Sequence, residues 1–357
     1  MLYINPLHPR VVVAKLNHQR GTKCYVNKKI AGPRCANNTC PICTSGTRAV
    51  KSLDVKIRTF LLTGNNIDDI LIGLPLVLQT INTNFWKAIF PKHSLSHLVP
   101  YFGNIEPKTL VKKDKNFQRR YKVIHPYVKQ IKSIFDYEWL SNKETKPYNA
   151  YALCKSLDRY TCSYCNRSYT STIITDTGKP IIRPTLDHWF PKSEYPLLRI
   201  SFFNLVPSCA SCNSSVKGTV NFNLKDHIHP YNDSAQSEEF EFDYAYTALN
   251  GYRISLKDTA SGAVAGSRAK NTLEAMYIDE IYNSNISELR DLLAIRKNYS
   301  TSYIRIMQSL LKKNMSKSEV YRILFGVVFE QENYHRRPLS KFKKDILKKL
   351  GMLDDMP

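Results

Sequence analysis

The sequence predicts a mainly helical α+β protein with a small zinc-stapled core between two helical regions. The first observation is a pair of Cys-x-x-Cys motifs, Cys162/Cys165 and Cys209/Cys212, separated by 43 residues. The residues between them read as two strands joined by a turn, and apolar residues recur with helical spacing on both sides. The length of the chain agrees with this division into a core and flanking regions, because 357 residues suffice for one large domain or two to three smaller ones.

The charge of the chain favours a polyanionic partner. Its 52 basic and 30 acidic residues give a net charge of +22. Residues 1–60 contain eleven basic residues and one acidic residue, and residues 296–349 contain fourteen basic and four acidic residues. Residues 231–295, in contrast, contain five basic and eleven acidic residues. Each neutralised phosphate releases counterions, so this pattern suits nucleic acid. Charge does not distinguish DNA from RNA; of the two, we expect DNA. Solubility alone is the alternative explanation.

The amino terminus and the cysteine usage point to a reducing, cytoplasmic environment without a membrane partner. No stretch approaches the ~18 consecutive apolar residues of a membrane span, and the first residues lack the layout of a signal peptide. Six of the nine cysteines form three Cys-x-x-Cys pairs. This spacing fits zinc-binding thiolates better than disulfides.

Four regions follow from composition and periodicity. Residues 1–48 form a basic Cys-rich head, and residues 49–140 form a helical region. Residues 149–232 form the core, and residues 233–357 form a β-hairpin followed by helices. Asn149 is expected to cap a short helix that ends near Leu157, and Ser316 with Glu319 forms a capping box. Segment 240–246 reads as a strand, and residues 250–252 (NGY) as a tight turn that leads into a second strand.

The head contains a candidate second zinc site. Its four cysteines, two of them in a Cys-x-x-Cys knuckle, could form a closed tetrahedral site that staples a segment poor in large apolar residues: Cys24, Cys35, Cys40 and Cys43. His8 or His18 could replace one cysteine, and ordinary reduced cysteines are the alternative.

The core combines a frame with candidate catalytic residues. The knuckle cysteines would fill all four positions of one zinc, which makes that zinc structural. Between them, strands at 169–175 and 181–188 are expected to flank a turn at 176–179. The second strand ends in Asp187 and His188, and Pro191 blocks its continuation. A carboxylate can hold a divalent cation against a phosphate, and a neutral imidazole can take a proton from water.

Two asparagines and a lysine complete the pattern. Asn204 precedes the second knuckle, and Asn213 and Lys217 follow it in a segment expected to begin a helix at 210–217. The order DH-x-x-P, N-L-x-P and C-x-x-C-N-x-x-x-K, framed by an upstream C-x-x-C, resembles the zinc-stabilised branch of the HNH (ββα-metal) endonucleases.

This resemblance implies a central ββα-metal nuclease core and a role for each matching residue. His188 would be the general base, and Asp187 a ligand of a catalytic Mg²⁺ or Mn²⁺. Asn204 would hold the loop and orient the base, while Asn213 would stand in the final His or Asn position and complete the metal site. Lys217 and Lys192 would contact substrate phosphate.

A weaker resemblance extends beyond the core. The segments 226–231 and 271–297 are similar to nuclease subunits of Septu-type and retron-associated anti-phage systems, which partner an ATPase. That similarity implies an effector nuclease, and His227 or His229 could add to its active site or be a polar loop histidine. The acidic 231–295 region or the C-terminal helices could dock the ATPase. A zinc-stapled nucleic-acid-binding module without catalysis is the competing hypothesis.

Overall fold

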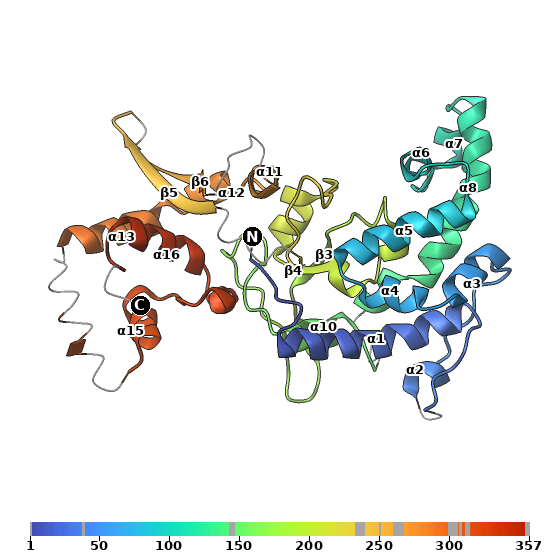
Figure 1. The fold of residues 1–357 in the computed structure, drawn as a ribbon, viewed down its shortest axis with the longest axis horizontal. Coiled ribbons are helices and arrows are strands. Elements are labelled where there is room, and N and C mark those ends of the chain that lie inside the picture. The colour runs from blue at the N-terminus through green and yellow to red at the C-terminus, as the bar shows by residue number, and fades with distance from the viewer. Residues whose placement is uncertain are drawn as a thin grey trace. The chain divides into compact units, whose positions relative to one another are not determined.

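The computed structural model describes residues 2–37, 40–142, 147–232, 240–249, 251–259, 268–298, 306, 309–310 and 315–353. The chain divides into two compact units (Figure 1). The helical unit comprises Leu7–Leu157 and Leu186–Val206, and the mixed unit comprises Met1–Pro6, Asp158–Thr185 and Pro207–Pro357. The predicted core at 149–232 therefore contributes residues to both units.

The helical unit is built from helices of very different length. Its elements are α1 (Pro9–Lys29), α2 (Pro41–Thr44), α3 (Val55–Leu62), α4 (Asn66–Ile72), α5 (Pro75–Ile89), α6 (Leu95–Leu98), η1 (Val99–Tyr101), α7 (Pro107–Leu110), α8 (Lys115–Ile134), α9 (Tyr137–Ser141), α10 (Ala150–Leu157), η2 (Pro196–Leu198) and η3 (Phe202–Asn204).

Local sequence signals set the ends of these helices. Proline at the first helical position begins both α1 and α5, and Pro75 thereby separates α5 from α4. The carboxylate of Asp114 accepts a hydrogen bond from Phe117 N and caps α8. The predicted cap at Asn149 is confirmed, since its side-chain oxygen accepts from the backbone of two residues in the first turn of α10.

The mixed unit combines short sheets with helices. Its elements are β1 (Ile173–Ile174), β2 (Pro180–Ile182), η4 (Ser211–Lys217), β5 (Phe240–Thr247), β6 (Gly251–Asp258), α11 (Arg268–Ala275), α12 (Ile278–Asn283), α13 (Ile286–Asn298), α15 (Lys317–Phe325), η6 (Gln331–Arg336) and α16 (Ser340–Lys349). The strands β3 (Thr185–His188) and β4 (Leu205–Ser208) pair with each other, and the division between the units runs through both. The structure is thus α+β, mainly helical, with two-stranded sheets.

One carboxylate of a buried ion pair on the C-terminal helix also binds the long hairpin. Strands β5 and β6 pair in antiparallel register from Phe240 opposite Asp258 to Thr247 opposite Gly251, which confirms the predicted hairpin. Its predicted tight turn includes residue 250, which lies outside the described residues. On α16, Lys341 donates to Asp345 at 2.9 Å, and the same carboxylate accepts from Phe242 N on β5. A buried charge needs such partners.

The structure corrects the predicted core hairpin in length. The first strand is reduced to β1, and the second, predicted over 181–188, is divided into β2 and β3 on either side of Pro184. Proline has no N–H to donate to a strand partner, which explains the break. The turn itself forms, with Gly178 at φ 83°. The capping box at Ser316 and Glu319 is also confirmed.

None of the helices in the described part of the chain combines the length and apolar character that crossing a bilayer requires. The expected helical stretch after residue 298 lies largely outside the described residues, as do residues 233–239 and 260–267 of the region predicted to be acidic overall.

Candidate zinc sites and candidate active site

The mixed unit brings the two predicted knuckles together. The sulfur atoms of its four cysteines all lie within 4.8 Å of one another: Cys162, Cys165, Cys209 and Cys212. Asn166 has φ 50°, a left-handed conformation that asparagine tolerates, and the next residue, Arg167, donates its backbone N–H to Cys165 Sγ at 3.4 Å. In the second knuckle, Cys212 N donates to Cys209 Sγ at 3.4 Å. Both knuckles therefore direct N–H groups at sulfur, which favours the thiolate form.

This donor set fits zinc. A Zn–S bond of ~2.3 Å places tetrahedral sulfurs ~3.8 Å apart, within the observed span. A hydrogen bond from Cys162 is the main cause that lowers the pKa of Cys165 to about 7. Burial raises the pKa of Cys162, so a metal ion would have to displace its proton. With four sulfur ligands the site is closed and could stabilise the fold without taking part in chemistry.

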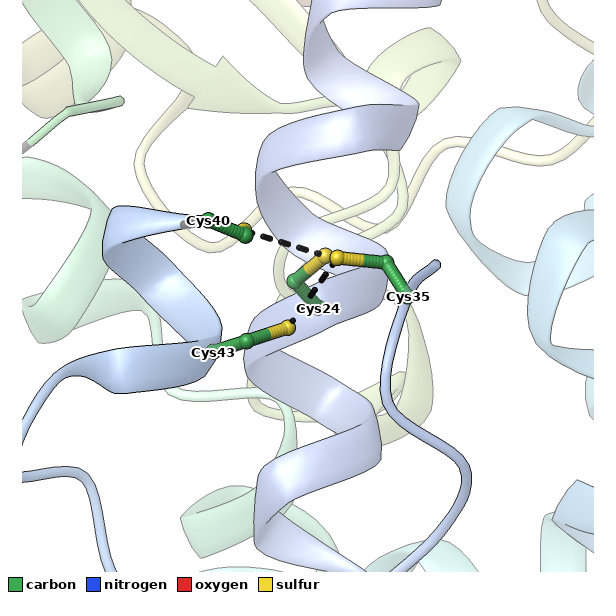
Figure 2. A group of neighbouring side chains, drawn as sticks. All are labelled: Cys24, Cys35, Cys40 and Cys43. Atoms are coloured by element: carbon green, nitrogen blue, oxygen red, sulfur yellow. Dashed lines mark hydrogen bonds between the residues drawn. The ribbon is translucent and has the colours of Figure 1, made fainter. Parts of the chain in front are cut away.

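The helical unit contains the second four-cysteine cluster, which the sequence predicts in the head. Cys24 projects from α1, and Cys35 lies in the loop that connects α1 to α2 (Figure 2). Cys40 lies at the start of α2, and Cys43 lies within this helix. The sulfurs of Cys35 and Cys43 are 3.4 Å apart, and those of Cys40 and Cys24 are 3.9 Å apart. All four lie within 4.8 Å of one another and could hold zinc.

The surroundings of this cluster are more open than those of the first. Three of its cysteines are half-buried, and a cavity of about 600 Å³ borders them. A backbone hydrogen bond from Cys43 is the main cause that lowers the pKa of Cys40 to about 7. His8 caps α1 and His18 is buried elsewhere in the unit, so the cysteines themselves provide the complete donor set.

The predicted acid–base pair lies at the end of β3 in the helical unit. Asp187 and His188 are 3% and 7% exposed. His188 Nε2 lies 2.8 Å from the carbonyl oxygen of Arg199, which can only accept, so Nε2 carries the proton. In a neutral ring with this tautomer, the lone pair is on Nδ1. A general base requires such a lone pair to take up a proton.

Two residues that the sequence did not single out hold His188. The ring of Tyr137 packs edge-on against the imidazole with centroids 4.5 Å apart, and its hydroxyl donates to Leu186 O at 3.3 Å. The carbonyl of Arg199 fixes the tautomer, as described above, and its guanidinium donates to Lys132 O at 3.1 Å. No sequence signal marks them, because a backbone carbonyl and a ring face act here through tertiary contact.

Asn204 closes the loop that follows His188. Its fully buried amide accepts from Phe190 N at 2.7 Å and donates to Phe190 O at 3.1 Å and Leu198 O at 2.9 Å. In addition, Trp189 N donates to the backbone carbonyl of Asn204 at 3.0 Å. These bonds tie both ends of the 190–204 loop, the function that the resemblance implies for this asparagine.

The remaining candidates are divided between the units. In the helical unit, Lys192 is exposed, with its ammonium 5.4 Å from the centroid of Tyr137. In the mixed unit, Asn213 is half-buried in η4, where the sequence predicts a helix. Lys217 is only 1% exposed, and its ammonium lies 5.3 Å from the Phe222 ring centroid. The phosphate contacts predicted for both lysines stay predictions.

The two histidines of the weaker resemblance both lie in the mixed unit. His227 Nδ1 accepts from Asn223 N at 3.4 Å, and His229 Nδ1 accepts from Tyr231 N at 3.1 Å. Burial lowers the pKa of both rings, so both stay neutral near pH 7. These bonds order the local loop, and a catalytic role for either ring stays a prediction.

Comparison of the chain with protein-family models, with curated proteins and with solved structures gave no significant match.

Proposed function

We propose that the chain is a metal-dependent endonuclease of the HNH type that hydrolyses phosphodiester bonds in nucleic acid. The observation that supports this most directly is the state of His188, whose Nε2 proton is bound by the Arg199 carbonyl at 2.8 Å. This contact orients the ring, which in its neutral form has its lone pair on Nδ1, next in sequence to a carboxylate and on a loop that Asn204 holds closed. In metal-assisted phosphodiester hydrolysis an imidazole can take the proton of the attacking water while a carboxylate holds the cation.

Each residue then has a defined part in the reaction. His188 Nδ1 takes a proton from the attacking water, and Asn204 holds the loop in the geometry that allows it. Asp187 supplies a hard oxygen ligand. Asn213 belongs to the mixed unit, and its role as second ligand stays a prediction from the sequence motif.

A single carboxylate fits Mg²⁺ or Mn²⁺ only if other ligands come from elsewhere. Among the described residues, the groups of three or more acidic, histidine or cysteine side chains that could hold a metal are the two cysteine clusters. Mg²⁺ usually keeps several waters and binds through one or two carboxylates plus substrate phosphates, which matches the donor set of Asp187. The cation would neutralise charge that develops on the phosphate. Metal binding should therefore depend strongly on the presence of nucleic acid.

The burial of Asp187 and His188 favours a second hypothesis. At 3% and 7% exposure, both side chains could serve only to pack β3, and the chain would then be a zinc-stapled nucleic-acid-binding module. We keep the nuclease hypothesis because packing alone would not require an ionisable pair at a strand end, whose burial is costly.

The decisive experiment compares cleavage by three proteins. Wild type, His188→Ala and His93→Ala are incubated with plasmid DNA and with total RNA, in Mg²⁺, Mn²⁺ or EDTA. His93 is an exposed histidine of the same unit and serves as the matched control. Loss of a general base should reduce cutting by ~10²–10⁴-fold.

We expect metal-dependent cutting by wild type and His93→Ala, and its loss in His188→Ala. Equal cutting by all three proteins would exclude His188 as the base, and tight binding without cutting would favour the binding module. The wider proposal of an anti-phage effector with an ATPase partner is tested by co-purification of an ATPase with the tagged chain from its host.

A further inference from the structure

Helix α8 carries a row of exposed cations that is interrupted at Pro126. Residues 107–134 contain nine basic residues and one acidic residue, Asp114, whose carboxylate caps the helix. Four of the cations recur at helical spacings of four, three and seven residues, which places them on one stripe: Lys115, Arg119, Lys122 and Lys129. All four are exposed, and within the described residues no ion pair involves them.

The stripe lies opposite the face of α8 that packs into the core. The buried face is formed by Tyr121, Ile124, His125, Val128, Ile131 and Ile134. At a rise of 1.5 Å per residue, Lys115 and Lys129 are about 21 Å apart along the axis. Unpaired cations along such a length repel one another, which is unfavourable for the free protein and favourable for binding a polyanion.

The C-terminal end of this helix contacts the segment that holds His188. The Arg199 guanidinium donates to Lys132 O at 3.1 Å, and the Arg199 carbonyl accepts from His188. Tyr137, just beyond the end of α8, packs on the imidazole and lies beneath the exposed Lys192 ammonium. All of these residues belong to the helical unit. The cationic stripe therefore leads along α8 toward the candidate base.

The chemistry of the stripe favours a double-stranded partner. Single strands are usually held by exposed aromatic rings that stack on bases. Across the fully described residues 115–134, the aromatic side chains are buried or half-buried: Phe117, Tyr121 and Tyr127. The B-DNA major groove admits a helix, whereas the A-form groove of duplex RNA is too narrow for side chains to read. A helix bearing cations and no exposed ring thus suits the phosphates of B-form DNA.

We propose that α8 is a docking helix for duplex DNA, which its cationic stripe grips through phosphates and directs toward His188. This inference rests on the proposed function and adds the partner and the surface that binds it. Four phosphate contacts would contribute about 3.6 to the slope of log K against log salt concentration.

Binding is measured in EDTA with the full-length chain carrying His188→Ala, so that no cleavage occurs. The probe is a fluorescein-labelled duplex of about 20 base pairs, several times the ~6 base pairs that a 21 Å stripe can follow. The stripe variant replaces the four cations by glutamine: Lys115→Gln, Arg119→Gln, Lys122→Gln and Lys129→Gln. The matched control removes four exposed lysines from other parts of the helical unit: Lys51→Gln, Lys56→Gln, Lys87→Gln and Lys155→Gln.

We expect the stripe variant to bind at least ~10-fold more weakly in low salt. The slope of log K against log salt concentration should become shallower by about 3.6, while the control changes little. Unchanged binding by the stripe variant, or an equal loss in the control, would overturn the inference. Tighter binding of single-stranded DNA or duplex RNA would overturn the choice of duplex DNA. Unchanged thermal melting of both variants shows that the fold persists.

The two proposals fail separately. If wild type does not cut but the stripe variant alone loses binding, the nuclease proposal fails and α8 remains a docking helix. If wild type cuts and the stripe variant binds the duplex as tightly as the control does, the docking inference fails and the nuclease proposal stands.

Discussion

Acidification should weaken the helical unit through His18. The ring is fully buried, with Nε2 donating to Ile200 O at 2.7 Å and Nδ1 placed 3.0 Å from the Tyr148 hydroxyl. This arrangement needs the neutral tautomer, in which Nδ1 accepts from the hydroxyl. Burial lowers the pKa of His18 from 6.5 to about 4, although the bond to Ile200 opposes the shift.

The sign of the effect follows from proton uptake. Below pH 6.5 the unfolded chain binds a proton at His18 that the folded chain does not bind until pH falls to about 4. The free energy of unfolding therefore falls as pH decreases through this window. Linkage gives a loss of about 1.2 kcal/mol between pH 7 and 5.5, and about 2.4 kcal/mol between pH 7 and 4.5.

The assay is urea denaturation followed by tryptophan fluorescence at pH 7, 5.5 and 4.5. All three tryptophans, Trp86, Trp139 and Trp189, lie in the helical unit, so the signal reports that unit alone. The matched variant is His18→Gln, which keeps a side-chain N–H donor but cannot titrate. Its pH dependence should be smaller than that of wild type by the stated amounts. An identical dependence in both proteins would refute the reasoning.

Three further predictions follow from other contacts. Elemental analysis should find about two zinc ions per chain, and Cys43→Ser or Cys212→Ser should each reduce this to about one; a count unaffected by either change would exclude the corresponding cluster. Asn204→Ala leaves three buried backbone groups without their partner and should lower the free energy of unfolding by ~2–4 kcal/mol in the fluorescence assay, with no loss if the loop is held by other means. Gly21→Ala would place a Cβ 2.5 Å from Tyr148 Cγ, so it should destabilise the helical unit by ~1–3 kcal/mol, and an unchanged midpoint would show that Tyr148 can move aside.

Local signals in the sequence predicted single elements well. The Asn149 cap, the capping box at Ser316 and the β5–β6 hairpin depend on residues only a few positions apart, so the pattern contains the whole interaction. The core hairpin was predicted too long because Pro184 was weighed as part of a strand. The roles proposed for Asp187 and His188 come from a motif and stay predictions, and the structure adds the contacts that hold the His188 ring.

The sequence by itself determined which side chains could bind zinc, since Cys-x-x-Cys spacing fixes two sulfurs on one turn. It also determined the basic character of the chain, which depends on composition alone. Only the tertiary structure decided that Tyr137 and the Arg199 carbonyl hold His188, and that the end of α8 contacts Arg199 through the Lys132 carbonyl. Such contacts join residues more than ten positions apart, and the packing that creates them leaves no periodic signal in the chain.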